Sequence, residues 1–364
     1  MAFTTLLSLL LIPSAWRVAR SSAQQRGQLA ADPAPLHAMR KIAPLTRTQR
    51  TPARLSASWV RAQFRRTDDG AGGPLQTLRR GIKFWARCMW HVAPLRMSLS
   101  TFGKDSLDSV VQGEPAVQSR PLRSYLRHGL SAAHRAKAVS SHFNWLSANL
   151  PPALIDRLYL EGPVTLLEST SQRPGLSLSR ASGLGREGEL ALHLEWDGVV
   201  LMSLAFSALE ADAVLPDREA VHLRGTRAVV GALQGARGAD AALRELSTHC
   251  QRLRPSALLL IALQALSAAR GLQAPMCVAA RSHVYAGYRS PRRKAALDYD
   301  SVWQSSGGEP AGRHYWLLPA RAVLRHDSEV ESKKRAQHRR KNLLRDEFYA
   351  STFDAARSML SQPV

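Results

Sequence analysis

Hydrophobic positions show no regular spacing in the first part of the chain and then adopt that of a helix. Between residues 76 and 93, Leu78, Ile82 and Trp85 follow one another at intervals of three or four, which places them on one helical face. The preceding residues 20–75 lack a sustained period and end in the turn-rich sequence TDDGAGGP. The pattern therefore predicts that the ordered chain begins with this helix.

One or two further helices are predicted over residues 121–150. The sequence SAAHRAKAVSSHFNWLSANL opens on Ser131, a residue type favoured at helix N-caps, and is followed by Pro151 and Pro152. Because proline disfavours a helical conformation in the residue before it, the helix should end there.

After residue 160 the pattern changes to that of strands. Asp197 and Gly198 separate two apolar stretches, and this dipeptide is a strong signal of a tight hairpin. Alternating or continuous apolar runs predict strands in VTLLEST, ELALHLEWDG, GVVLMSLAFSAL and RAVVGALQG. Together these segments predict an antiparallel meander.

Downstream of the meander, helices alternate with short strands. Two helices divided near Pro255 precede a strand over residues 274–280, a short helix in AALDYDSVWQ and a strand over residues 314–319. This order predicts an α+β fold, or mixed α/β layer, in which N-terminal helices precede a mainly antiparallel sheet with packed helices. An acetyltransferase-like arrangement is one version of it.

The chain divides into four predicted segments, and its 45% hydrophobic content is ample for a core. The first, residues 1–75, is a disordered basic arm or a non-native N-terminal extension. The others are a helical subdomain over residues 76–160, an α/β core over residues 161–349 and a C-terminal tail over residues 350–364.

The formal net charge is +22, and so basic a balance suggests nucleic acid or an anionic membrane as a partner. Residues 1–100 hold 16 of the 50 Lys and Arg residues and 3 of the 28 acidic residues. A second basic run, residues 333–341, falls on a predicted helix, where cations usually form a solvated face. We therefore expect only weak contact of these segments with nucleic acid or membrane.

The apolar run Leu6–Ile12 is too short to cross a bilayer, so we expect no transmembrane helix. The Arg- and Ser-rich sequence behind it also fits a mitochondrial-type targeting segment, and a translation start at Met39 is an alternative explanation. The three cysteines lack CxxC spacing, which argues against a disulfide framework or a metal site. A reducing, cytoplasmic location fits best.

A glycine-rich turn follows the last strand of the meander. In LQGARGAD, Gly235 and Gly238 allow a tight turn, and the free amides of the next helix could hold a phosphate beside Gln234 and Arg237. The placement is similar to that of the pyrophosphate loop of the GCN5-related N-acetyltransferases, although Arg237 stands where their motif has glycine. Coenzyme A or an acyl carrier would be the ligand. A plain strand-to-helix turn is the alternative.

The sequence RSHVYAGYRSPRRKAALDYDSVWQSSGG, residues 281–308, holds the candidate catalytic residues. His283 could act as a general base near neutral pH. Tyr299 could supply a proton or a hydroxyl hydrogen bond, and Asp300 could orient a base or a cationic substrate. The stretch begins at the carboxyl end of a predicted strand, where α/β sites commonly open.

The same stretch holds candidate substrate-binding residues. Arg292 and Arg293 could bind an anion, Trp303 could form an aromatic wall, and Gly307 and Gly308 could shape a turn beside it. The alternative is a short helix whose aromatic residues pack inward and whose end lies at the two glycines.

These blocks, together with VVGALQG, RLRPSALLLIALQALS, HYWLLP, ESKKRAQHRRKNLL, RPLRSYL and HRAKAVSSHFNWL, resemble those of the VirK/YbjX-like proteins of Gram-negative bacteria over about residues 78–349. The resemblance implies a bacterial protein linked to virulence, survival of antimicrobial peptides, and responses to stress and DNA damage. It implies no reaction.

Two functions fit. The first is an acyltransferase-like enzyme acting on an envelope component or a toxic small molecule. The second is a non-catalytic stress factor that binds nucleic acid, anionic membrane or a protein through its basic segments.

Overall fold

The computed structural model describes residues 55–68, 73–215, 223–287, 298–323, 328 and 330–359. Its sheet is organised around the hairpin that Asp197 and Gly198 close. Both residues have positive φ, 50° and 75°, which suits the turn between two twisted strands. They join β3 (Leu190–Trp196) to β4 (Val199–Glu210), so this predicted hairpin is confirmed.

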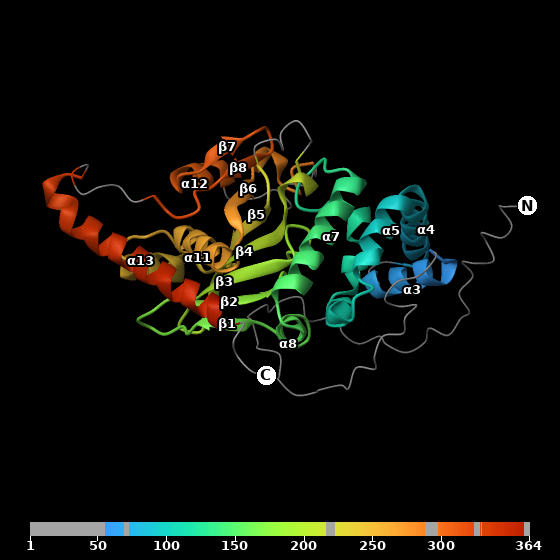
Figure 1. Ribbon diagram of the computed structural model, residues 1–364, viewed down its shortest axis with the longest axis horizontal. Helices are drawn as coiled ribbons and strands as arrows, with labels where there is room; N and C mark the ends of the chain where they lie inside the picture. The colour runs from blue at the N-terminus through green and yellow to red at the C-terminus, as the bar shows by residue number, and fades with distance from the viewer. Residues whose placement is uncertain are drawn as a thin grey trace, which may run out of the picture.

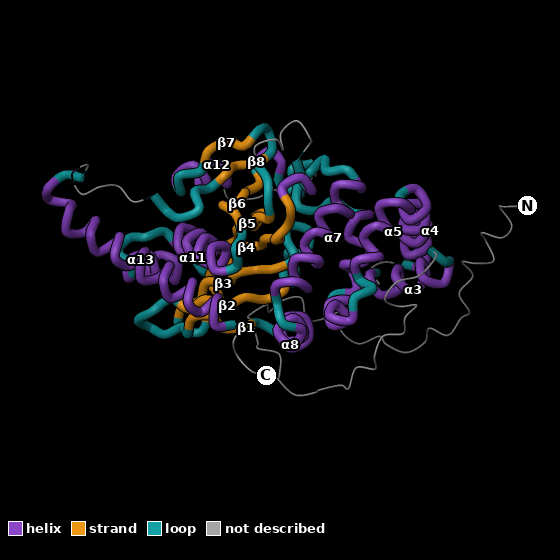
Figure 2. The backbone as a smooth tube through the Cα atoms, in the orientation of Figure 1, coloured by secondary structure: helices purple, strands orange, loops and turns teal. Residues whose placement is uncertain are grey.

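Eight strands in the described part of the chain form one mixed sheet (Figures 1 and 2), in the order β1-β2-β3-β4-β5-β6-β8-β7. β5 and β6 are parallel, and the other neighbouring strands are antiparallel. The predicted α+β class is confirmed. The remaining strands are β1 (Val164–Leu167), β2 (Gly175–Arg180), β5 (Thr226–Gly235), β6 (Gln273–Val278), β7 (Glu309–Ala311) and β8 (Tyr315–Leu317).

Helices cover both faces of this sheet (Figure 1). The almost wholly buried α11 (Pro255–Ala269) packs against β3 to β6 on one face, and α13 (Arg335–Ser358) packs against α11. On the other face, α7 (Ala132–Asn149) packs against β4. α10 (Asp240–His249) and α11 form the crossover that the parallel strands β5 and β6 require.

The helices before β1 form a second, smaller core. α3 (Ala57–Thr67), α4 (Pro74–Trp90) and α5 (Val92–Thr101) share apolar contacts with the residue Leu122. Because α3 precedes residue 76, it corrects the predicted start of the ordered chain. Three of its 11 residues, Trp59, Val60 and Gln63, are buried, and this short helix depends on tertiary packing for its stability.

The C-terminal end of α13 extends past residue 349 into the segment predicted as a tail. The remaining elements of the described chain are short. In the described part of the chain, no helix combines the length and the apolar character that crossing a membrane requires. The short elements are η1 (Asp105–Leu107), α6 (Asp108–Gly113), η2 (Pro115–Leu122), α8 (Pro152–Asp156), η3 (Arg157–Glu161), η4 (Ala211–Ala213), η5 (Ala280–Ser282), α12 (Tyr299–Ser305) and η8 (Ser332–Lys334).

Sequence analysis missed the strands β2 and β7. In β2, Ser177 and Ser179 are buried because their hydroxyl groups bond to Glu195 and His193 of β3, so polar residues occupy positions where the pattern would require apolar ones. β7 is three residues long and contains Pro310, which cannot donate to a β-ladder. Neither strand therefore has the periodic signal of a long buried strand.

The loop between β2 and β3, residues 181–189, crosses close to the backbone of β4 and β5. A register shift in the pairing of β4 with β5 leaves Gly231 as an extra residue in β5, a β-bulge. A Cβ atom at Gly231 would overlap the carbonyl oxygen of Glu187, and one at Gly188 would overlap the backbone of Phe206. The close approach of the loop to the sheet therefore requires glycine at both positions.

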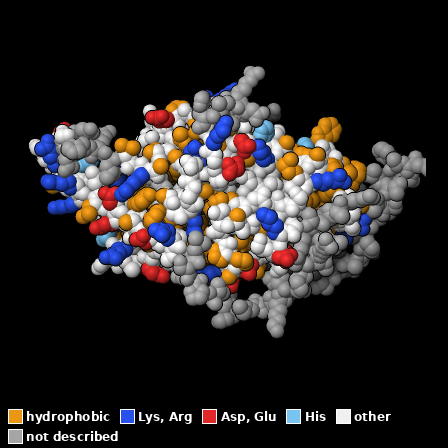
Figure 3. All heavy atoms as spheres, viewed as in Figure 1, with side chains coloured by type: hydrophobic (Ala, Val, Ile, Leu, Met, Phe, Trp, Pro, Cys, Tyr) orange, Lys and Arg blue, Asp and Glu red, His pale blue; other side chains and the backbone are white. Residues whose placement is uncertain are grey.

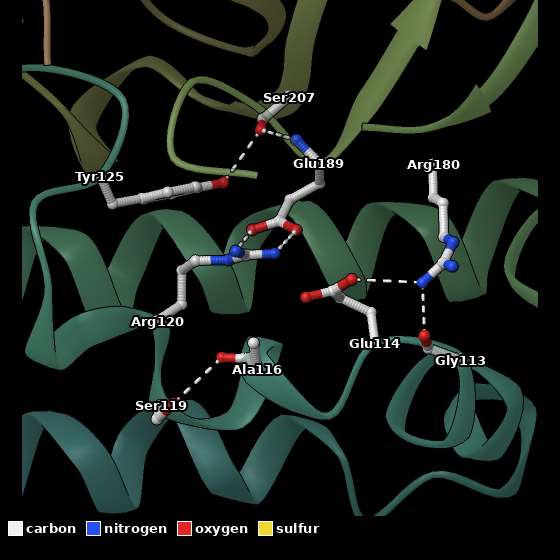
Figure 4. A network of polar contacts seen from close by, with 9 residues as sticks. All are labelled: Gly113, Glu114, Ala116, Ser119, Arg120, Tyr125, Arg180, Glu189 and Ser207. Carbon is white, nitrogen blue, oxygen red and sulfur yellow. Dashed lines mark hydrogen bonds and ion pairs between the residues drawn. The ribbon is translucent and has the colours of Figure 1, made fainter. Parts of the chain in front are cut away.

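A buried ion pair holds the end of this loop to the helical layer (Figure 4). Arg120 donates to both carboxylate oxygens of Glu189, at 3.1 and 2.9 Å, and the two side chains are 10% and 1% exposed. The backbone N–H of Glu189 donates to the hydroxyl of Ser207 at 3.1 Å, and that hydroxyl lies 2.9 Å from the hydroxyl of Tyr125. The loop is thus anchored by charge and by hydrogen bonds.

The substitution Gly231→Ala should lower the free energy of unfolding by about 3 kcal/mol or more, because the added methyl group forces the loop from the sheet. The control is Gly235→Ala in the same strand, where the new Cβ would lie 3.7 Å from Leu243, an ordinary contact. Urea denaturation measures both. A Gly231→Ala protein as stable as the control would contradict the described approach of the loop.

The substitution Arg120→Ala should cost about 3–5 kcal/mol, because it leaves the Glu189 carboxylate buried without its cation. Lys137→Ala is the control, since it removes an ion pair with Asp212 whose side chains are 48% and 54% exposed, and it should cost less than about 1 kcal/mol. Urea denaturation again provides the comparison. Similar losses in the two proteins would show that the buried pair does not anchor the loop.

Candidate functional site

The candidate site lies where the parallel strands β5 and β6 separate. Their pairing ends at Val230 and Cys277, whereas β5 continues to Gly235 and remains paired with β4. Beyond Val230, side chains from other segments replace β6 as neighbours of β5. The carboxyl ends of parallel strands are where α/β sites commonly form.

A buried carboxylate and a buried imidazole meet at this strand separation. Oε1 of Glu187 lies 3.1 Å from Nε2 of His283, and the two side chains are 1% and 3% exposed. The side-chain amide of Gln234 donates to the same oxygen at 3.0 Å. The backbone N–H of Tyr285 donates to Nδ1 of His283 at 3.4 Å. With Nδ1 as the acceptor, the proton of a neutral imidazole lies on Nε2. Nε2 is close to the carboxylate but makes no hydrogen bond within the described part of the chain.

Tyr299 is the third buried member of this group. Its hydroxyl accepts a hydrogen bond from the backbone N–H of Leu233 at 3.4 Å, and its ring centroid lies 5.2 Å from that of His283. Burial, together with the negative Glu187, raises the pKa of Tyr299 above its ordinary value despite the bond from Leu233. The phenol is therefore protonated at neutral pH. We call Glu187, His283, Gln234 and Tyr299 the Glu187 cluster.

Asp300 does not contact this cluster. Its Oδ1 accepts hydrogen bonds from the backbone N–H of Ala280 at 2.9 Å and from Nε1 of Trp316 at 2.8 Å. These bonds join the start of α12 to the segment after β6 and to β8. Through them Asp300 positions the stretch that carries His283, and its catalytic role stays a prediction.

The residues expected to form a substrate wall have structural contacts instead. Trp303 is 1% exposed, donates from Nε1 to the carbonyl of Val278 at 3.0 Å, and stacks on Tyr299. Gly307 has φ +81°, and Gly308 donates to the carbonyl of Trp303 at 2.9 Å. The two glycines end α12 while the aromatic rings pack inward, as in the helical alternative.

The predicted phosphate-binding turn is exposed at the end of β5. Gly235, Arg237 and Gly238 all lie at the surface, and Gly238 has φ +77° with open space beside it. No side chain caps the N-terminus of α10. The side chain of Gln234 reaches inward to Glu187 and so connects this turn to the cluster. Arg292 and Arg293 lie outside the described residues.

Glu187 is the member of the candidate site that sequence analysis missed. It occupies the loop sequence SGLGREGEL, in which three glycines and two carboxylates stand between strands. Glycine-rich backbone next to acidic residues between two buried strands is the available signal. It does not reveal that the carboxylate turns inward to a histidine almost a hundred residues further along.

The described residues contain no reactive thiol and no group of three His, Cys, Asp or Glu side chains arranged to hold a metal ion. Cys88, Cys250 and Cys277 are free and buried. Burial raises the pKa of all three thiols, to about 12 for Cys88 and about 11 for Cys250.

Comparison with known proteins provides a family. The family model described as "Protein of unknown function (DUF535)" matches residues 74–352, well over half of the chain. The chain belongs to this family. The DUF535 region contains the Glu187 cluster, the turn after β5 and both anchoring ion-pair residues.

A curated relative supports the predicted YbjX-like assignment, which is confirmed. The uncharacterized protein YbjX of Escherichia coli (strain K12) is 25% identical over 246 residues, which cover 65% of this chain and 71% of YbjX. No solved structure matches the chain.

The three thiols of this DUF535 protein should react slowly with a disulfide reagent at pH 8, because each is buried and almost fully protonated. The rate of labelling, monitored by absorbance, should be low in buffer. In denaturant all three thiols should become exposed and react at once. One thiol that reacts in native protein as fast as in denaturant would contradict the described burial.

Proposed function

We propose that this protein is an acyltransferase that takes an acyl group from a thioester of coenzyme A or of an acyl carrier. The acceptor is an amine or hydroxyl of an envelope component or of a small toxic molecule. The observation that carries the proposal is the Glu187 cluster at the separation of two parallel strands, beside an exposed strand–turn–helix connection.

The turn after β5 is suited to the phosphates of such a donor. Its glycines leave the backbone open, Arg237 adds a charge, and the uncapped N-terminus of α10 directs N–H groups outward. From the turn, the phosphopantetheine arm would run beside the part of β5 that has no β6 partner. That arm contains amides, and an extended chain with amides can add to a strand edge.

His283 and Tyr299 would carry out the proton transfers of acyl transfer. His283 would remove the proton of the attacking amine or hydroxyl through Nδ1, once the acceptor has displaced the long bond from the N–H of Tyr285. The imidazolium charge would be compensated by Glu187 near Nε2. A bond forms between the acceptor atom and the acyl carbon, and the carbon–sulfur bond breaks. Tyr299, whose raised pKa keeps it protonated, would give its proton to the leaving thiolate. The proton on His283 then restores the phenol by way of solvent.

A second function is favoured by one observation on α13. The exposed residues Lys333, Lys334, Arg335, Arg339 and Arg340 lie at its start, and its first turn contains no acidic residue. Cations at a helix N-terminus oppose the helix dipole. Figure 3 shows Lys and Arg side chains gathered at that end of the molecule. Binding to nucleic acid or anionic membrane is therefore the competing proposal.

The test begins with binding of acyl-coenzyme A to the full chain. A donor at 100 times its dissociation constant should stabilise the protein by about 2.7 kcal/mol, which thermal unfolding detects. Arg237→Glu should weaken the binding, whereas reversal of the charges at residues 333–341 should not. If the charge reversal removes the biological activity of the protein and Arg237→Glu does not, the binding function replaces the enzymatic one.

The chemical step is tested by release of coenzyme A thiol from a bound acyl donor in the presence of amines. Tyr299→Phe and His283→Gln should each lower the rate roughly 100-fold or more while leaving donor binding intact. Tyr349→Phe and His249→Gln are matched controls on other elements. Wild-type rates in both cluster variants would contradict the assigned roles.

A further inference from the structure

A cavity of about 520 Å³ lies among the N-terminal helices, away from the residues assigned above. It is lined by α3, α4, the start of α7, the segment after η2 and the loop between β2 and β3. Among the described residues its lining includes one carboxylate, Asp68, and six cationic side chains: Arg80, Lys83, Arg87, Arg123, Arg135 and Arg186. We call it the cationic cavity.

The cations of this cavity are held together against their mutual repulsion. Burial lowers the pKa of Arg123, and the nearby Arg186 and Arg87 lower it further. Burial and Arg87 act in the same direction on Arg135, which is oriented by bonds from its guanidinium to the carbonyls of Pro121 at 2.8 Å and Leu130 at 2.9 Å. Such a group of half-desolvated cations is stabilised by an anion placed among them.

The carboxylate of Asp68 does not balance this charge. Its Oδ1 lies 2.8 Å from Nε of Arg80, on one side of the cavity. Neither Lys83 nor Arg87 has a carboxylate partner in the described part of the chain, and both are exposed where a ligand would enter. The excess of positive charge therefore remains for a ligand.

The lining also offers apolar surface. Phe64 and Phe84 lie with ring centroids 5.9 Å apart, and Leu122 packs with them. The volume falls within the range of small-molecule sites, roughly 300–1,000 Å³. Inorganic phosphate alone would leave most of this space empty, whereas a phosphorylated molecule with a planar or apolar body would use both kinds of lining.

We propose that the cationic cavity binds a small molecule that carries two or more phosphate groups on an aromatic or apolar body. Arginine forks bind phosphate oxygens in pairs, and the aromatic residues contact the body of the ligand. Nucleoside polyphosphates and the head groups of phosphorylated lipids share this chemistry. The site is independent of the acyl-transfer proposal, because it shares none of the residues of the Glu187 cluster or of the turn after β5.

The experiment is titration calorimetry of the full chain with ADP, ATP, inorganic tripolyphosphate and inorganic phosphate at low and physiological ionic strength. ATP or ADP should bind at least tenfold more tightly than inorganic phosphate. Arg87→Gln and Lys83→Gln should each weaken that binding about tenfold. Arg79→Gln should leave it unchanged, because Arg79 is exposed on the same helix but does not line the cavity.

Two further measurements distinguish the cationic cavity from the turn after β5, and a lipid head group from a free nucleotide. Arg237→Glu, in the turn after β5, should not alter the affinity for ATP; an equal loss in that protein and in Arg87→Gln would overturn the assignment to the cavity. Vesicles containing phosphatidylinositol bisphosphate should compete with ATP if the source is a lipid head group with several phosphates, and should not compete if it is a free nucleotide. The absence of binding by every probe at about 1 mM would overturn the proposal.

Discussion

The buried pair of Arg120 and Glu189 is the interaction on which the arrangement of both sites depends. Removing two charges from water costs several kcal/mol unless each is satisfied, and here the guanidinium meets both carboxylate oxygens. The pair joins η2 in the helical layer to the loop that enters β3 (Figure 4). Since neither charge can return to water without disrupting this junction, the loop is fixed against the sheet.

One loop consequently serves two regions of opposite character. Arg186 lines the cationic cavity, while the next residue, Glu187, is buried beside His283. The glycine at position 231 lets the backbone of Glu187 approach β5 at its bulge. A buried carboxylate needs hydrogen-bond donors; the side-chain amide of Gln234 supplies one, and the imidazole of His283 lies 3.1 Å away. Polar side chains thus line the separation of β5 and β6, and Nε2 of His283 has no hydrogen-bond partner among the described residues.

The candidate site could be predicted in part. His283, Tyr299 and Gln234 were selected from the sequence, and the fold brings these residues together although they belong to two separate blocks. Asp300 and Trp303 were selected for the same reasons, yet their polar atoms serve backbone and side-chain bonds within the sheet. Residue type suggests chemistry, but only the partners of each atom distinguish a reacting group from a positioning one.

The sequence by itself determined the family, the α+β class, the hairpin at Asp197 and Gly198, the cap at Ser131 and the start of α11 at Pro255. These features are local, because periodicity, capping and turn preferences act over a few residues. Tertiary structure alone decided which residue lies beside His283, that α3 is an ordered helix, and that the cationic cavity forms. Each of these depends on side chains from distant segments that come together only after folding, and neither spacing nor composition records such contacts.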